Sequence, residues 1–291
     1  MSVDESRAPG FAWIDIWGAQ AESAFDPLAQ EPALTGERAL LGFAGVDAAR
    51  RPAVLMFPGG GYAKLVASKH AAMAELFRKM GLHTFILGYR LTPHHTFPAA
   101  LNDARRAVQL VRHHALAGRL PVDPDRLVVF GTSAGGHLAA LLATEPAWSA
   151  PAIAHGAGLQ SPLPNAHVCC FPVIHLQGED AHHASRERLL GPGAVMGLAS
   201  ALEPDRRVHA GVSPAFIWHT AEDPTVRASN SLAYAQSLLR AGVSTDLHVW
   251  NPGGHGLMPA QDVPEIRDWL VLLRGWLERL GFVGGATGSE G

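Results

Sequence analysis

The segment VVFGTSAGGHLAALL, residues 128–142, constrains the fold more than any other part of the sequence. An apolar run of strand type breaks at Gly-Thr-Ser-Ala-Gly-Gly and continues as an Ala/Leu-rich helical pattern. The pattern G-x-S-x-G between a strand and a helix is typical of a nucleophile elbow, a sharp turn that exposes its serine. Gly131 and Gly135 lack Cβ atoms, so the strand and the helix can approach closely. The segment predicts Ser133 as a nucleophile, although a serine at such a turn can also simply cap the helix.

Short apolar runs alternate with helical patterns along most of the chain. This alternation predicts an α/β fold with a mostly parallel central sheet and helices on both faces. Two further segments, 13–17 and 38–43, are candidate edge strands. The strands are expected at 53–57, 83–89, 126–130, 167–174, 215–220 and 244–250. The helices are expected at 68–80, 99–116, 227–241 and 263–280, with one more directly after the elbow.

The length and composition favour a single folded domain over residues 1–291. A chain of 291 residues with 47% hydrophobic and 17% charged residues can bury one large core. Residues 176–208 are polar and Gly-rich, interrupt the alternation, and are interpreted as a short cap insertion over the carboxyl edge of the sheet. The Gly/Ser-rich end, 283–291, is expected to be a flexible tail.

Charge and hydropathy exclude several classes of partner. The net charge of −3 gives no electrostatic footprint for nucleic acid. No apolar run reaches the roughly 20 residues of a membrane span, and the polar N-terminus lacks a signal-peptide pattern. We therefore expect a cytoplasmic protein with a small-molecule substrate and no nucleic-acid or membrane partner. A homo-oligomer remains compatible with the sequence.

The histidines and cysteines do not predict a metal site. Several of the 16 histidines come as adjacent pairs, at 94–95, 113–114 and 182–183. Neighbouring residues point to different faces of an element, whereas helical metal ligands are spaced by three or four residues. The adjacent Cys169 and Cys170 are interpreted as small buried side chains. We expect no metal and no other cofactor.

A serine hydroxyl needs a base, and the base needs an orienting acid. In an elbow of this kind the chain order is serine, then acid, then histidine. Asp223 follows the strand expected at 215–220, and His255 follows the strand expected at 244–250. The glycines around His255 predict a loop that can bring the imidazole over Ser133.

Two neighbouring residues offer alternatives to this assignment. Glu222 could hydrogen-bond the histidine in place of Asp223, but Asp223 precedes Pro224, which fixes a turn. His219 is set aside as the base because it lies within a strand and precedes the acid in the chain.

Attack on an ester carbonyl also requires N–H donors for the developing negative charge. One donor is the N–H of Ala134, which follows the nucleophile at a helix N-terminus. The others are expected from FPGGGY, residues 57–62, directly after an early strand. We predict an oxyanion hole formed by Gly60, Gly61 and Ala134.

Five stretches together resemble the α/β-hydrolase family. The branch they resemble is that of small esterases related to acetyl esterases and acetylxylan esterases, and hormone-sensitive-lipase-like enzymes form a related branch. They are FPGGGY, GYRLTPHHTFPAALNDARRAVQLV, LVVFGTSAGGHLAALLAT, SPAFIWHTAEDPTV and GGHGL, and they span about residues 50 to 280. The resemblance implies an α/β-hydrolase fold. Carried over by position, it implies Ser133 as nucleophile, Asp223 as acid and His255 as base.

Two features of the matched stretches need separate interpretation. The family often has histidine where this chain has Pro58. Since the oxyanion donors are backbone groups, we expect activity to survive this difference. Asp103, Arg105 and Arg106 are interpreted as helix-face and loop-anchoring charges with no catalytic role.

These residues predict a serine carboxylesterase that removes a short acyl group, foremost acetyl, with acetylated sugars as a candidate substrate class. An amidase of the arylformamidase type would use the same triad and glycine loop. A non-catalytic binding protein on the same fold is a third hypothesis, but such proteins tend to lose a triad member and none is missing here. No pair of carboxylates is recognisable as arranged for glycoside cleavage.

Overall fold

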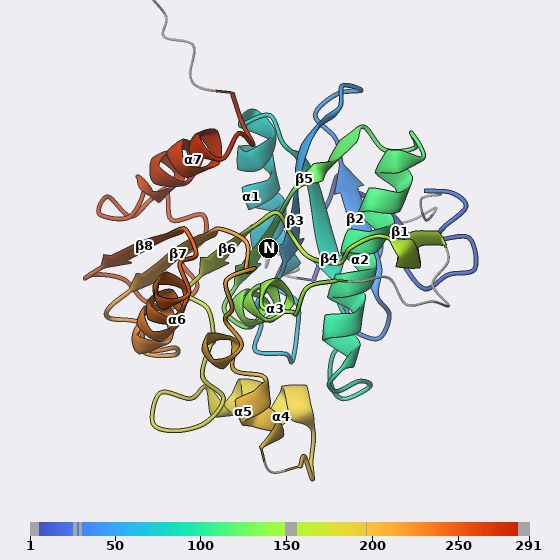
Figure 1. Cartoon of the computed structure of the whole chain (residues 1–291). Coiled ribbons are helices and arrows are strands. Elements are labelled where there is room, and N and C mark those ends of the chain that lie inside the picture. The colour runs from blue at the N-terminus through green and yellow to red at the C-terminus, as the bar shows by residue number, and fades with distance from the viewer. Residues whose placement is uncertain (1–5, 26–27, 29–30, 149–155, 196, 285–291) are drawn as a thin grey trace, which may run out of the picture.

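An eight-stranded sheet runs through the molecule in the order β1-β2-β4-β3-β5-β6-β7-β8 (Figure 1). The structure, a computed structural model, describes residues 6–25, 28, 31–148, 156–195 and 197–284. The pairings β1–β2 and β2–β4 are antiparallel, and the five pairings from β4 through β8 are parallel. The strands are β1 (Ala12–Asp15), β2 (Leu40–Ala44), β3 (Arg51–Phe57), β4 (His83–Gly88), β5 (Val122–Thr132), β6 (Ala166–Cys170), β7 (Ala215–Thr220) and β8 (Thr245–Trp250).

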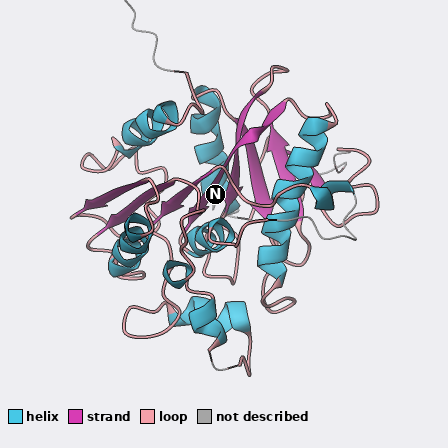
Figure 2. Ribbon diagram, viewed as in Figure 1, coloured by secondary structure: helices cyan, strands magenta, loops and turns pink. Residues whose placement is uncertain are grey.

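Helices cover both faces of the sheet, as the alternation predicts (Figure 2). In Figure 1, α2, α3 and α6 lie on the face toward the viewer, and α1 and α7 lie together on the other side. The α/β prediction with a mostly parallel sheet is confirmed. The helices are α1 (Ala67–Lys79), α2 (Ala99–Leu116), α3 (Ala134–Ala143), α4 (His183–Leu190), α5 (Leu198–Ala201), α6 (Ser229–Arg240) and α7 (Trp269–Arg279), with 3-10 turns at Gly156–Leu159 and Pro204–Arg206.

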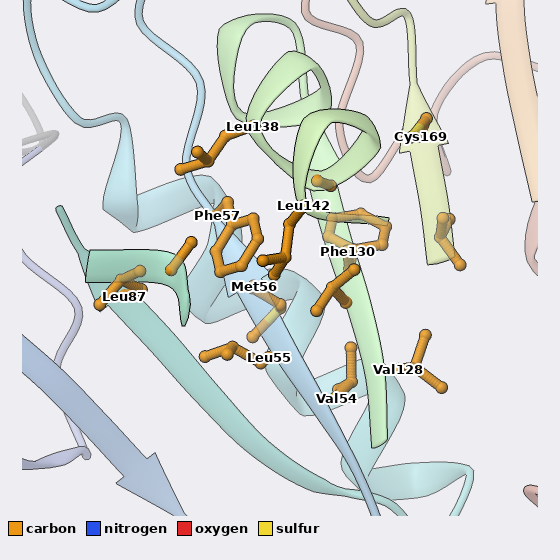
Figure 3. Close-up of a cluster of buried hydrophobic side chains, with 14 of the residues drawn as sticks. Val54, Leu55, Met56, Phe57, Leu87, Val128, Phe130, Leu138, Leu142 and Cys169 are labelled. Atoms are coloured by element: carbon orange, nitrogen blue, oxygen red, sulfur yellow. The ribbon is translucent and has the colours of Figure 1, made fainter. Parts of the chain in front are cut away.

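The core lies between α3 and the central strands. Leu138 and Leu142 of α3 face the sheet beside Phe57 of β3 and Phe130 of β5 (Figure 3). All ten residues of α3 are buried, which explains its Ala/Leu-rich sequence without a polar face. Because β3 and β5 are covered on both sides, their apolar runs are continuous. The elbow thus starts from a strand whose end is buried in the core.

The N-terminal residues extend the sheet at one edge and are tied to α2. The candidate edge strands at 13–17 and 38–43 form as β1 and β2. The indole of Trp17 donates to Asp103, which also accepts a bidentate bond from Arg90. Arg106 pairs with Glu22 at 2.6 Å. These charges hold loops in place, as the sequence predicts.

Two elements end earlier or begin later than expected. The run 167–174 stops being a strand after Cys170, because Phe171 adopts a φ of 39° and Pro172 has no N–H to continue the ladder. The helix expected from 263 begins only at Trp269. The residues before Trp269 form isolated turns, such as the one in which the N–H of Ile266 donates to Val263 O.

Residues 176–208 lie outside the sheet and carry the short helices α4 and α5, which stand apart from the two helical layers (Figure 1). The buried carboxylate of Glu203 accepts the N–H groups of Leu176 and Gln177 at 2.9 Å, which closes the base of this segment. The imidazole of His137 on α3 donates to Leu202. We call residues 176–208 the cap.

Most of the tail expected to be flexible, residues 285–291, lies outside the described residues. Within the described part of the chain, no helix is both long and apolar enough to cross a membrane.

Candidate active site

Ser133 lies at a sharp turn between β5 and α3, where the backbone has φ 53° and ψ −119°. The glycines on either side of it are required by contact. A Cβ on Gly131 would lie 2.0 Å from Gly135 O, and a Cβ on Gly135 would lie 2.0 Å from Phe57 O. The Ser133 N–H donates to Cys170 O, and Ser133 O accepts from Val173 and His137. The neighbouring chain therefore holds the strained turn in place.

The structure brings Ser133, His255 and Asp223 together from three loops that follow β5, β8 and β7. Ser133 Oγ lies 2.8 Å from His255 Nε2, and His255 Nδ1 lies 2.6 Å from Asp223 Oδ2. Because an ionised carboxylate only accepts hydrogen bonds, His255 carries its proton on Nδ1. Its Nε2 then accepts from the serine hydroxyl, which is the arrangement that activates a serine nucleophile.

Asp223 is held by donors on all sides. Its Oδ1 accepts the N–H groups of Thr225 and Val226 at 2.8 and 2.9 Å. Burial raises the pKa of Asp223, but hydrogen bonds from His219, His255 and Val226 outweigh it and place the pKa below its ordinary value. The carboxylate therefore stays ionised and keeps the histidine in one tautomer.

His219, which the sequence analysis set aside as a base, contacts the same carboxylate. Its Nε2 donates to Val226 O at 2.9 Å and lies 3.3 Å from Asp223 Oδ2, while its Nδ1 accepts from Ser231 Oγ at 2.7 Å. Sequence reasoning missed this role. The available signal was its position at the end of a strand, four residues before the acid.

Glu222, the alternative acid, is exposed and points elsewhere. Its carboxylate lies 3.4 Å from the side-chain amide of Asn251. The structure thus brings Asp223 to His255 and leaves Glu222 at the surface.

The N–H groups expected to form the oxyanion hole lie in the loop after β3 and at the start of α3. Within the described part of the chain, the N–H groups of Gly60, Gly61 and Ala134 have no hydrogen-bond acceptor. Gly60 has a φ of 135°, and a Cβ there would lie 2.1 Å from Lys64 O. Only glycine fits this turn, in which Gly60 O accepts from Ala63 and Lys64.

The side chains of Thr132 and Tyr89 hold this glycine loop. Thr132 Oγ1 accepts from the Gly59 N–H at 3.1 Å and lies 3.4 Å from Nε2 of the buried His70. Where the family often has histidine, the carbonyl of Pro58 accepts from the buried Tyr89 hydroxyl at 2.5 Å. Hydrogen bonds from buried groups therefore hold the backbone at Pro58 and Gly59.

A cavity of about 380 Å³ opens over Ser133. The cap supplies one wall of it through His182 and Arg188. The described residues that line it are Gly59, Gly60, Gly61, Lys64, Val66, Lys69, His70, Thr132, Ser133, Phe171, His182, Arg188, Thr225, His255, Gly256 and Met258.

Three histidines of the adjacent pairs contact backbone carbonyls. His113 and His114 contact the carbonyls of Glu22 and Ala21, and His95 contacts that of Glu37. In residues 6–25, 28, 31–148, 156–195 and 197–284, no group of three or more His, Cys, Asp or Glu side chains is placed to hold a metal ion. Cys169 and Cys170 are both buried free thiols.

The first curated relatives match about two thirds to three quarters of the chain. Endo-1,4-beta-xylanase B of Butyrivibrio fibrisolvens is 30% identical over 224 residues, which are 74% of this chain and 34% of that protein. The chain spans half or less of the length of the first curated relatives it matches.

Two solved structures are similar over most of the chain. One is an acetyl ester-xyloside bifunctional hydrolase from Caldicellulosiruptor lactoaceticus, with TM-score 0.83 and 33% identity, covering 97% of this chain and 100% of that one. The other is a thermophilic esterase from Thermogutta terrifontis, with TM-score 0.71 and 28% identity, covering 86% and 90%. A family model for the alpha/beta hydrolase fold matches residues 54–259. The sheet, the elbow and these matches together show that the chain belongs to the alpha/beta hydrolase family.

Proposed function

We propose that this protein is a serine carboxylesterase that hydrolyses esters of short acyl groups, foremost acetyl. The observation that carries the proposal is the continuous set of hydrogen bonds from Ser133 Oγ through His255 to Asp223. The carboxylesterases and acetylxylan esterase among the relatives support the same reaction class. The small cavity above Ser133 supports a small ester as substrate.

The first half of the reaction follows from the hydrogen bonds. Ser133 Oγ attacks the ester carbonyl carbon while His255 Nε2 takes the hydroxyl proton. The carbonyl oxygen becomes negatively charged and accepts from the N–H groups of Gly60, Gly61 and Ala134. His255 then gives its proton to the departing alcohol oxygen, the C–O bond breaks, and the acyl group remains on Ser133.

The second half repeats these steps with water. His255 Nε2 takes a proton from water, whose oxygen attacks the acyl carbon. The tetrahedral species collapses, Ser133 Oγ recovers the proton from His255, and the carboxylic acid leaves. Asp223 stabilises the imidazolium in both halves and keeps its own charge throughout.

A substrate panel with a covalent probe tests the proposal. A fluorophosphonate should modify Ser133, as read by peptide mass spectrometry, and the wild type should hydrolyse p-nitrophenyl acetate. Ser133→Ala should lose both properties, whereas Ser23→Ala, which changes an exposed serine, should keep them. Ester hydrolysis by Ser133→Ala at the wild-type rate would refute the proposal. Efficient turnover of formylkynurenine without turnover of esters would point to an amidase.

A further inference from the structure

His182, a cap residue that lines the cavity, has a tautomer that its hydrogen bonds determine. The backbone N–H of Ser185 donates to His182 Nδ1 at 3.3 Å, and Ser185 Oγ lies 2.7 Å from the same nitrogen. Since a backbone N–H can only donate, His182 Nδ1 is the unprotonated nitrogen. The proton of the neutral ring is therefore on Nε2. Burial, His255 and Arg188 all lower the pKa of His182, which keeps the ring neutral.

Two cationic side chains, Arg188 and Lys69, line the same cavity as His182. Arg188 on α4 donates to Gly61 O at 3.2 Å, so its guanidinium lies over the glycine loop. Lys69 on α1 donates to Gly256 O at 2.8 Å, beside His255. Gly61 O and Gly256 O are neutral carbonyl oxygens, so these hydrogen bonds do not neutralise the charges of Arg188 and Lys69.

The side chains that line the cavity offer more hydrogen-bond donors than acceptors. Among the described residues that line the cavity there is no Asp, Glu, Asn or Gln, and the only side-chain oxygens are the hydroxyls of Thr132, Ser133 and Thr225. A neutral sugar presents hydroxyls that both donate and accept, and its recognition needs acceptors as well as donors. A lining that has hydrogen-bond donors and positive charges but no carboxylate side chain instead suits a ligand group that only accepts hydrogen bonds, such as a carboxylate.

We propose that the natural ester carries a carboxylate on its alcohol half, recognised by Lys69, Arg188 and His182. This proposal rests on the proposed esterase function and specifies its substrate class. The alcohol half is indicated by the position of Lys69. His255 gives its proton to the departing alcohol oxygen, and Lys69 is held against the residue that follows His255. The chemical steps are unchanged, because the carboxylate is bound and does not react.

Solvent screening limits how strongly Lys69 and Arg188 can favour a charged substrate. Lys69 and Arg188 are both exposed side chains, so each interacts with an anion through water-rich surroundings. Exposed ion pairs contribute modestly, and salt weakens them further. A preference of about three- to tenfold for the charged substrate at low ionic strength is the expected scale.

The test compares para-acetoxybenzoate with its neutral isostere para-acetoxybenzamide. The wild type should show the higher kcat/KM for the benzoate, and raising the ionic strength should reduce this ratio toward one. Arg188→Gln and Lys69→Gln should each lower the ratio, while Arg188→Lys should keep most of it. Because both substrates are measured on the same variant, a general loss through the bond from Arg188 to Gly61 cancels in the ratio.

A matched control removes a charge from the same helix away from the cavity. Arg186 is on α4, is absent from the cavity lining and lies 3.7 Å from Glu187, so Arg186→Gln should leave the ratio unchanged. Hydrolysis of both esters with a ratio of one or less would overturn the carboxylate proposal and leave the esterase function standing. p-Nitrophenyl hemisuccinate carries its carboxylate on the acyl half. A preference for it over p-nitrophenyl propionate, together with no preference for acetoxybenzoate over acetoxybenzamide, would overturn the assignment to the alcohol half. Hydrolysis of none of these esters would overturn both proposals.

Discussion

His219 Nε2 lies 3.3 Å from Asp223 Oδ2, the same oxygen that faces His255 at 2.6 Å. The carboxylate is thereby shared between a buried histidine on β7 and the histidine over Ser133. Since Ser231 fixes the other nitrogen of His219, the ring cannot turn without losing a buried hydrogen bond. We therefore expect His219 to act as a positioning residue for the candidate acid.

His219→Leu should lower kcat by about tenfold to a hundredfold with little change in KM, since a hydrogen bond to a charged group contributes about 1.5–3 kcal/mol. His219→Gln, which keeps an N–H donor, should recover part of the loss. Steady-state kinetics on p-nitrophenyl acetate, with melting curves to confirm folding, measure this. A folded Leu variant with the wild-type kcat would show that the contact is only structural.

Asp223→Asn should cost activity on the order of a thousandfold or more, because the amide presents the wrong partner to His255 Nδ1. Glu222→Gln is the control at the neighbouring position and should change kcat/KM by less than about twofold, as expected for a surface substitution. The comparison uses kcat/KM for the two variants under identical conditions. The reverse ranking would transfer the acid role to Glu222.

We expect kcat/KM to be highest for acetyl and propionyl esters and to fall toward octanoyl. A long acyl chain gains about 0.8 kcal/mol per methylene only where an apolar groove buries it. The apolar side chains of the described lining are only Val66, Phe171 and Met258. A p-nitrophenyl ester series measures the trend. A steady rise with chain length would contradict it.

Gly135→Ala should destabilise the fold by roughly 3 kcal/mol or more, because the new Cβ would lie 2.0 Å from Phe57 O and core strands cannot move apart cheaply. Gly275→Ala is the matched control on α7, where an added Cβ meets no atom within 4 Å. That substitution should stabilise the protein by about 0.5–1 kcal/mol through helix propensity. Denaturant unfolding measures both, and equal effects would contradict the close approach at the elbow.

Acid should destabilise the protein between about pH 6.5 and pH 4. Burial lowers the pKa of His70 and His137 from 6.5 to about 4 and that of His167 to about 3. In this window the unfolded chain binds protons that the folded chain does not, so the free energy of unfolding decreases as pH falls. Each histidine contributes on the order of 3 kcal/mol to this loss.

The slope of Tm against pH measures this effect. His137→Gln should flatten the slope even if it lowers Tm at neutral pH, because the replaced side chain takes up no proton. His94→Gln, at an exposed position, should leave the slope as in the wild type. A slope unaffected by His137→Gln would remove that histidine as a source of the acid sensitivity.

The sequence by itself determined the sheet and the place of the candidate nucleophile. The apolar runs and helical spacings predict β3 to β8 and their helices, because periodicity reflects which face of each element is buried. Gly131 and Gly135 around Ser133 identify the elbow, because only residues without Cβ fit that close approach. The order of serine, acid and histidine then follows from where the later strands end.

Only the tertiary structure decided which side chains meet. Asp223 and Glu222 are adjacent and chemically alike, and their directions depend on the donors of Val226, Thr225 and His219 around one of them. The start of α7 at Trp269 depends on its indole bond to Pro259 and on packing against the sheet. His182 and Arg188 reach the cavity only because the cap folds back over the glycine loop. These outcomes rest on contacts between residues distant in the chain, which local pattern and turn chemistry do not encode.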